Sequence, residues 1–235
     1  MKITARTHIG NVRPSNQDSF LVQEGKYSLV GVADGMGGHN GGDIASQMAV
    51  LMLGRVLEGA KPDEALLLGG IEEINQLIYQ EQLKNELHSG MGTTLTVIWE
   101  DDDRILLGHV GDSRAYRIRQ GKIEQVSRDH SMVGEMVRDG ILTKEQAMNH
   151  PYRNVITKAV GTAETVEPDV VILDKERGDK YLICSDGLYE YVTEEDMLKL
   201  LQFSPADHAA DVMLETALEK GGRDNVTLLI AEVTA

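Results

Sequence analysis

Short apolar runs rich in β-branched residues recur along the chain, and they predict a protein built largely from short β-strands. Several of these runs are bounded by glycine, aspartate or asparagine, which are common where strands end. The expected strands are Lys2–His8, Ser19–Gln23, Tyr27–Ala33, Thr93–Glu100, Arg104–Val110, Ala115–Arg119, Val170–Leu173, Tyr181–Cys184 and Val226–Val233. The Gln120-Gly121-Lys122 stretch has the composition of a hairpin turn.

Helical periodicity predicts four longer segments, which are grouped rather than interleaved with single strands. They are Gly42–Leu57, Pro62–Leu87, Thr193–Leu201 and Pro205–Glu219. Thr193 followed by Asp196, and Ser204 followed by Asp207, resemble capping arrangements at helix N-termini. Grouped helices favour antiparallel sheets, so we expect an α+β sandwich instead of a doubly wound parallel sheet.

The chain has no internal repeat and no linker-like tract, so a single domain over residues 1–235 is the expected organisation. From about Arg128 to Thr162 the sequence is polar and lacks a clear period. A connection this long predicts an irregular surface flap with a functional role.

Composition narrows the classes of function. The formal net charge of -15 argues against binding of nucleic acid through its phosphates. No apolar stretch is long enough to span a membrane, and no secretory signal is evident, so we expect a cytoplasmic protein. The single cysteine, Cys184, fits a reducing compartment.

Aspartates stand at the ends of several predicted strands. They are Asp18, Asp34, Asp112, Asp186 and Asp224. Turn formation accounts for any one of them alone. Strand ends from one sheet meet along a rim, however, and several carboxylates brought together there would repel one another unless cations neutralised them. Oxygen donors of this kind favour Mg²⁺, Mn²⁺ or Ca²⁺ over zinc or copper.

Five short motifs, in this order, resemble those of the metal-dependent (type 2C) protein phosphatases, and the likeness spans nearly the whole chain. They are Arg13-Pro14-Ser15-Asn16-Gln17-Asp18, Asp34-Gly35-Met36-Gly37-Gly38-His39, Gly111-Asp112-Ser113-Arg114, Ser185-Asp186-Gly187-Leu188 and Gly222-Arg223-Asp224-Asn225. The resemblance implies a four-layer α/β/β/α sandwich with the metal site at one end. It also implies hydrolysis of phosphoserine and phosphothreonine by direct attack of a metal-bridging hydroxide.

The resemblance further assigns ligands for Mn²⁺ or Mg²⁺. Asp34 would bridge two ions, Asp186 and Asp224 would complete one of them, and the carbonyl of Gly35 would bind the other. Asp18 would act through metal-bound water. Asp112, together with Asp186, would help to hold a weaker third ion, as in bacterial members.

Two further residues receive roles in catalysis from the same resemblance. Arg13 matches an arginine that grips the phosphate, a task suited to a planar bidentate donor. His39 would protonate the leaving alkoxide, although its register is that of the bacterial branch. The residues Arg153–Gly161 resemble the segment that closes the flap. The implied partners are phosphorylated proteins and a Ser/Thr kinase that this enzyme would oppose.

Three alternative functions fit the sequence less well. A cysteine-based phosphatase needs an arginine six positions after its nucleophile, but Glu190 stands there after Cys184. A nucleotide-binding glycine loop needs Gly-x-Gly-x-x-Gly, and Asn40 occupies the place of its last glycine. A catalytically silent, phosphatase-like regulatory module would usually lack some of the metal-binding aspartates, all of which are present here.

Overall fold

Two antiparallel β-sheets form the centre of the molecule in a computed structural model that describes residues 1–37 and 41–234. The first sheet has the order β1-β11-β10-β7-β8, and the second has β2-β3-β5-β6-β9 with β4 paired to β3. The strands of the first sheet are β1 (Lys2–His8), β7 (Arg114–Arg119), β8 (Lys122–Gln125), β10 (Lys180–Cys184) and β11 (Val226–Glu232). Those of the second are β2 (Asp18–Gln23), β3 (Leu29–Met36), β4 (Gly92–Thr93), β5 (Leu95–Glu100), β6 (Arg104–Val110) and β9 (Asp169–Asp174).

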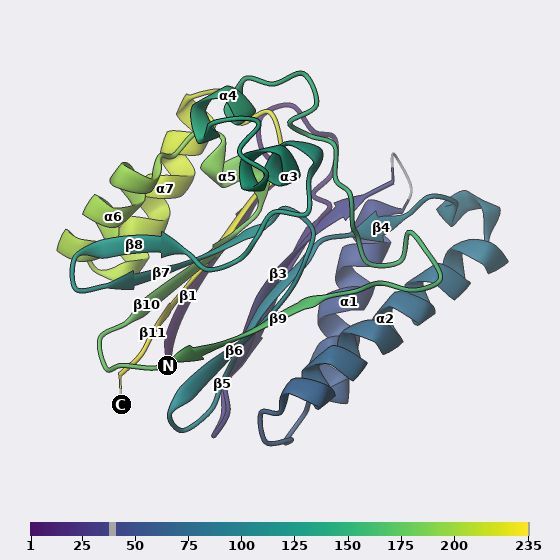
Figure 1. Ribbon diagram of the computed structural model, residues 1–235, viewed down its shortest axis with the longest axis horizontal. Helices are drawn as coiled ribbons and strands as arrows, with labels where there is room; N and C mark the ends of the chain where they lie inside the picture. The colour runs from purple at the N-terminus through teal and green to yellow at the C-terminus, as the bar shows by residue number, and fades with distance from the viewer. Residues whose placement is uncertain (38–40, 235) are drawn as a thin grey trace.

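Helices cover the outer face of each sheet (Figure 1). On the second sheet lie α1 (Gly42–Val56) and α2 (Glu64–Lys84), which is followed by the 3₁₀ turn η2 (Glu86–His88). On the first sheet lie α5 (Asp186–Tyr189), α6 (Glu194–Phe203) and α7 (Ala206–Glu219). This arrangement confirms the predicted α+β class and the four-layer α/β/β/α sandwich of two antiparallel sheets flanked by helices.

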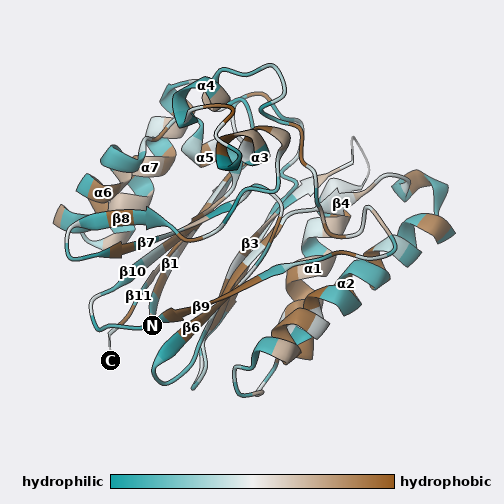
Figure 2. Ribbon diagram, viewed as in Figure 1, coloured by the Kyte–Doolittle hydropathy of each residue, from teal (hydrophilic) through white to brown (hydrophobic). Residues whose placement is uncertain are grey.

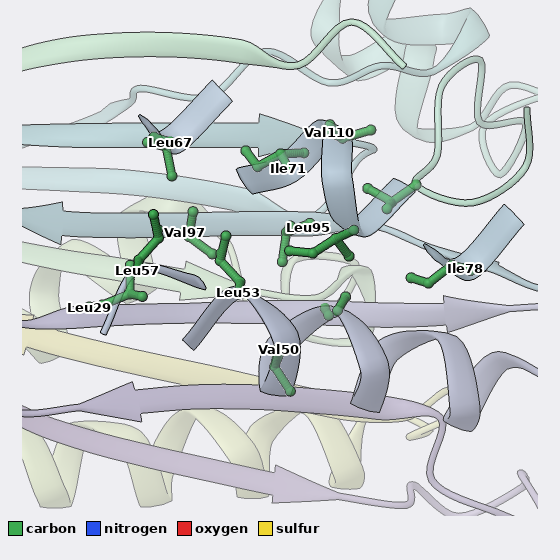
Figure 3. Close-up of a cluster of buried hydrophobic side chains, with 14 of the residues drawn as sticks. Leu29, Val50, Leu53, Leu57, Leu67, Ile71, Ile78, Leu95, Val97 and Val110 are labelled. Atoms are coloured by element: carbon green, nitrogen blue, oxygen red, sulfur yellow. The ribbon is translucent and has the colours of Figure 1, made fainter. Parts of the chain in front are cut away.

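Three hydrophobic clusters join the four layers. One lies between the two sheets and includes Val30, Ile98 and Ile183. A second joins the first sheet to α6 and α7. The third joins α1 and α2 to the second sheet, and Figure 3 shows Leu53 of α1 beside Val97 and Leu95 of β5. Each sheet therefore has two buried faces, and Figure 2 shows the apolar residues concentrated along the strands and the inner sides of the helices.

Polar backbone and side-chain bonds interrupt two of the predicted elements. The expected helix over Pro62–Leu87 ends at Lys84, because Asn85 is extended and its side chain accepts from the Leu87 amide to start η2. The expected strand Thr93–Glu100 breaks at Thr94, whose hydroxyl bonds both Ser113 and the Asp34 amide. The order of elements is unaffected by these breaks.

The two predicted capping arrangements have different outcomes. Thr193 accepts from the amide of Asp196 and begins α6, as expected. The prediction for Ser204 and Asp207 is wrong, because Pro205 occupies the N-cap position of α7 and no side-chain cap bond forms there. The proline side chain has no oxygen with which to accept from the amides of the first turn.

The flap, residues 128–162, is more ordered than the polar sequence predicts. It contains α3 (Met132–Arg138) and α4 (Lys144–Met148), both capped by a preceding hydroxyl residue. Bridges of Ser131 with Ile156 and of Thr93 with Val160 close its base. The prediction of an irregular segment is therefore wrong, since local capping gives short helices that hydrophobic periodicity does not reveal.

None of the helices in the described part of the chain combines the length and the apolar character that a bilayer crossing requires.

Candidate metal centre

The five predicted aspartates come from strand ends that meet at one end of the sandwich. Asp18 opens β2 and lies directly opposite Asp34 of β3 in the antiparallel register. Asp112 follows β6, Asp186 follows β10, and Asp224 precedes β11. Antiparallel pairing brings the start of one strand beside the end of its neighbour. Asp18, Asp34 and Asp112 stand at strands of the second sheet, and Asp186 and Asp224 at strands of the first. The stacking of the two sheets, and not the pairing within one sheet that the sequence suggested, therefore completes the rim.

Burial and mutual repulsion make this rim unfavourable for negative charge. Burial, followed by the charges of the other four aspartates, holds the pKa of Asp34 well above its ordinary value. Burial, followed by Asp112 and Asp224, does the same to the pKa of Asp186. Burial raises the pKa of Asp18 to about 6 and that of Asp112 to about 7. Like charges opposed in this way need cations beside them to remain ionised.

Two carboxylate oxygens at the rim have unused bonding capacity. Oδ1 of Asp18 and Oδ1 of Asp186 are buried and have no hydrogen-bond partner. A buried acceptor without a partner is costly, and a metal ion is one way to satisfy it. The second oxygen of Asp18 accepts from Ser185 Oγ at 2.8 Å, which fixes the plane of its carboxylate.

The donors suit an ion that retains water molecules. Within residues 1–37 and 41–234, no group of three or more His, Cys, Asp or Glu side chains is arranged to hold one ion together. Mg²⁺, for which Mn²⁺ often substitutes, is usually bound through one or two carboxylates and keeps several waters. Paired aspartates with orphaned oxygens fit this mode better than a closed cage of side chains.

Close backbone packing shapes the rim around Gly35. A β-carbon at this position would overlap the carbonyl oxygens of Gly42 and Gln17, so only glycine fits. The amide of Gly35 donates to the Gln17 carbonyl at 3.1 Å, and the Gln17 amide donates to Asn225 Oδ1 at 2.8 Å. The loop before β2, the end of β3 and the start of β11 are thereby fixed relative to one another.

Arg13 lies beside Asp224 at the rim. Its Nη2 donates to Asp224 Oδ2 at 2.6 Å, and its side chain is 48% exposed. The hydrogen bond to Asp224, together with the charges of Asp224, Asp186 and Asp34, raises the pKa of Arg13. A permanently charged and accessible guanidinium thus stands beside the carboxylates. His39, the predicted general acid, lies outside the described residues.

Arg114, for which the sequence predicts no role, connects the rim to the flap. Arg114 forms a salt bridge with Asp129 at 2.7 Å, and its guanidinium carbon lies 3.7 Å from the centre of the Tyr189 ring. The Tyr189 hydroxyl in turn donates to the carbonyl of Asp112 at 3.1 Å. The only sequence signal for this link is the position of Arg114 inside a recognised motif.

Cys184 does not provide an alternative reaction centre. Its side chain is fully buried between β10 and the helices of the first sheet. Burial raises the pKa of the thiol to about 12, so the thiolate that a nucleophile requires is disfavoured. The prediction that Cys184 is a structural thiol is confirmed.

Comparisons with known proteins agree with this architecture. A family model described as protein phosphatase 2C matches residues 5–220. The serine/threonine protein phosphatase PstP of Mycobacterium tuberculosis is 38% identical over 99% of this chain, which spans 45% of that relative's length. The serine/threonine phosphatase stp of Listeria monocytogenes is also 38% identical, over 97% of this chain and 94% of its own.

Solved structures give the same result. Serine/threonine phosphatase Stp1 from Staphylococcus aureus has a TM-score of 0.92 and 33% identity, covering 100% of this chain and 95% of its own. The catalytic domain of PstP in complex with two manganese ions has a TM-score of 0.88 and 34% identity, covering 100% and 98%. The sandwich and its acidic rim define the class of metal-dependent phosphatases. Within that class, the chain belongs to the protein phosphatase 2C family.

Proposed function

We propose that this chain is a metal-dependent protein serine/threonine phosphatase that hydrolyses phosphoserine and phosphothreonine. The observation that carries the proposal is the rim of five buried or half-buried aspartates, two of which have orphaned carboxylate oxygens. The names of the bacterial relatives supply the substrate class. We further propose that residues 1–235 form one catalytic domain with a flap at residues 128–162, acting in the cytoplasm on phosphoproteins of a Ser/Thr kinase.

The proposed ligand roles are those that the resemblance to the phosphatase family implies. Asp34 would bridge two ions, Asp186 and Asp224 would hold one, the Gly35 carbonyl would hold the other, and Asp18 would act through water. Asp112 with Asp186 would take a weaker third ion. When bound, Mn²⁺ or Mg²⁺ supplies charge neutralisation and a water of lowered pKa. Ser185 supports this set by orienting the carboxylate of Asp18.

The remaining chemistry belongs to the chain's own residues. Arg13 binds the phosphate oxygens from the open side of the rim, where its guanidinium is half exposed. Water attacks phosphorus directly, because Cys184 and Ser185 are fully buried and Ser185 Oγ is already bonded to Asp18. His39 is proposed as the general acid on the basis of its sequence position alone.

Removal and return of the metal test the proposal. We expect hydrolysis of a phosphothreonine peptide to stop in excess chelator and to resume with Mn²⁺ or Mg²⁺. Asp34→Ala and Asp186→Ala should abolish turnover, whereas Asp102→Ala, in the exposed β5–β6 turn, should not. Full activity in chelator would refute the metal-dependent reaction. No turnover under any metal condition would favour the silent regulatory module.

The role of His39 as the general acid can be tested by how the reaction rate depends on the leaving group of the substrate. His39→Ala should slow phosphoserine and phosphothreonine peptides by roughly 10²–10⁴-fold, the usual contribution of a general acid. An aryl phosphate should be affected much less, because its leaving oxygen needs little protonation. Equal slowing of both substrates would remove His39 from this role while leaving direct attack by water intact.

A further inference from the structure

A long groove of about 970 Å³ extends from the metal rim along the flap. One wall is formed by α3 and α4 of the flap, and the other by the segment from Asp186 to Glu195. Figure 1 shows α3, α4 and α5 gathered at the same end of the sandwich. Because Asp112 and Asp186 lie in its lining, a substrate phosphate held at the rim would place the adjoining residues of its chain in this groove.

The charges on the groove walls are unevenly compensated. Three cations of the lining already have carboxylate partners there: Arg114 with Asp129, Lys144 with Glu194, and Arg153 with Glu190. Four other lining cations have no carboxylate within salt-bridge distance in the described part of the chain. They are Arg128, Arg138, Lys220 and Arg223.

The anions of the lining do not offset this excess. Asp112 and Asp186 are assigned to metal ions, and Asp129, Glu190 and Glu194 are in the pairs just described. Only Glu195, among the described lining residues, remains as an uncompensated acid. The groove therefore carries a local positive excess on a chain whose formal net charge is -15. Charge complementarity of this kind selects partners and speeds their association.

We propose that the groove binds an acidic segment of the phosphoprotein next to the phosphorylated residue. The proposal rests on the proposed function for the choice of a phosphoprotein and for the assignment of Asp112 and Asp186 to metal ions. The four cations without carboxylate partners still outnumber the unpaired acids of the lining when these two aspartates are counted with Glu195. Arg128 and Arg138 are exposed and line the groove, the first at the base of the flap and the second in α3. Among the described residues, the side chain of Arg138 has one hydrogen-bond partner, the Asp129 carbonyl at 3.1 Å.

Matched peptides test this preference. Phosphothreonine peptides of equal length would carry glutamate, glutamine or lysine at the flanking positions, on the N-terminal or the C-terminal side. We expect kcat/KM with Mn²⁺ at low salt to be about tenfold higher for the better glutamate peptide than for its glutamine counterpart, since several exposed charge pairs each contribute a few-fold. Raising the ionic strength should reduce the ratio. Equal kcat/KM for the glutamate and glutamine peptides, whichever flank carries these residues, would overturn the proposal. A preference for the lysine peptides would overturn it as well.

A charge-matched pair of variants localises the effect. Arg128→Gln with Arg138→Gln should bring the glutamate-to-glutamine ratio of kcat/KM close to one. Lys2→Gln with Arg177→Gln removes the same charge from exposed sites outside the groove lining and should keep the wild-type ratio. A ratio that falls equally in both double variants would indicate a general effect of net charge and would contradict a groove-specific site.

A binding measurement separates this inference from the proposed function. Fluorescence anisotropy with the unphosphorylated glutamate peptide needs no turnover, and we expect weak binding at low salt that Arg128→Gln with Arg138→Gln abolishes. If no peptide is hydrolysed while this binding persists, the proposed function fails and the groove stands. If all peptides are hydrolysed at one rate and none binds, the groove fails and the function stands.

Discussion

Asp34, the proposed bridging ligand, shows how a cluster of carboxylates opposes stability at the level of one residue. Its carboxylate lies opposite that of Asp18 and senses those of Asp112, Asp186 and Asp224 as well. Like charges directly opposed across two strands destabilise a sheet. The metal-free protein therefore bears the cost of an arrangement that bound cations, or protonation of some of the carboxylates, relieve.

Neutralising this carboxylate should stabilise the metal-free protein while removing its response to metal. We expect Asp34→Asn to raise the free energy of unfolding in chelator by about 0.5–2 kcal/mol, a gain typical when a functional site is relaxed. Addition of Mn²⁺ should then shift the melting temperature far less than it does in the wild type. Asp102→Asn, at an exposed turn, serves as the control. A less stable variant in chelator would contradict the idea that repulsion dominates at this rim.

The aspartates of the rim could be proposed as a group from sequence because each stands at a strand end within a recognisable motif. The supporting contacts could not. Ser185 bonds Asp18 across 167 residues of sequence, and Tyr189 bonds the Asp112 carbonyl across 77. Such contacts depend on how the two sheets are stacked, and local pattern carries no information about that stacking. Arg114 is a similar case, because its partner Asp129 lies in the flap.

At the scale of elements, Asp129 provides one of the side-chain attachments of the flap to the sandwich, beside the backbone bonds that close the base of the flap. Its carboxylate accepts from Arg114 and from Gln125, and both members of the Arg114 pair are largely buried. Removing one partner of a buried ion pair is strongly destabilising, because the remaining charge lacks a partner. The distal pair of Lys144 with Glu194 is exposed, and pairs of that kind contribute little.

Hydrogen exchange should distinguish these two attachments. Asp129→Asn should accelerate exchange of the flap-base amides of Met132 and Thr157, which donate to Val155 and His130, while amides of β10 and β11 keep their protection. Lys144→Ala should leave all of these amides unchanged. Uniform loss of protection through the sheets would instead mean that Asp129 supports global stability and not the flap.

The predictability of an element depended on its length. The strands Lys2–His8 and Arg104–Val110 have the predicted bounds, whereas the predicted strand Tyr27–Ala33 is observed as Leu29–Met36. The hairpin strand Lys122–Gln125 and the single-turn helix Asp186–Tyr189 were missed, since four residues carry no readable period. The flap helices α3 and α4, of seven and five residues, were also missed because they are too short to show a helical period. Their stability comes from hydroxyl caps and from contacts with the sandwich, which propensity alone does not reveal.

At the scale of the whole molecule, two groups of buried residues give the metal-free protein opposite responses to acid. The raised pKa values of Asp18, about 6, and Asp112, about 7, mean that the folded state takes up protons before the unfolded state does. These residues favour folding as the pH falls below about 7. Burial, followed by the charge of His130, lowers the pKa of His109 from 6.5 to about 4. The unfolded state then takes up the proton first, so His109 disfavours folding over that range.

His109 joins the second sheet to the base of the flap. Its Nδ1 shares a hydrogen bond with Thr96 Oγ1 at 2.9 Å, and its Nε2 lies 2.9 Å from the Arg128 carbonyl oxygen. The ring also lies beside that of His130, with 4.9 Å between centroids. A neutral imidazole satisfies both bonds, whereas a second proton would place a charge in a site that has no solvent exposure. Glutamine offers a neutral donor and acceptor of similar reach.

Comparison of the wild type with His109→Gln isolates the contribution of His109 to the pH dependence of stability, because the aspartates contribute equally to both proteins. We expect the wild type to be the more stable at pH 7.5, where the histidine is neutral in both states. The difference in unfolding free energy should shrink by about 3 kcal/mol as the pH falls to 4, the value that a pKa change from 6.5 to about 4 implies. Denaturant titrations in chelator at several pH values measure it, with His208→Gln, an exposed histidine of α7, as the control. A difference that stays constant from pH 7.5 to 4 would show that His109 is protonated as readily in the folded protein as in the unfolded chain, and that its burial is not what opposes folding in acid.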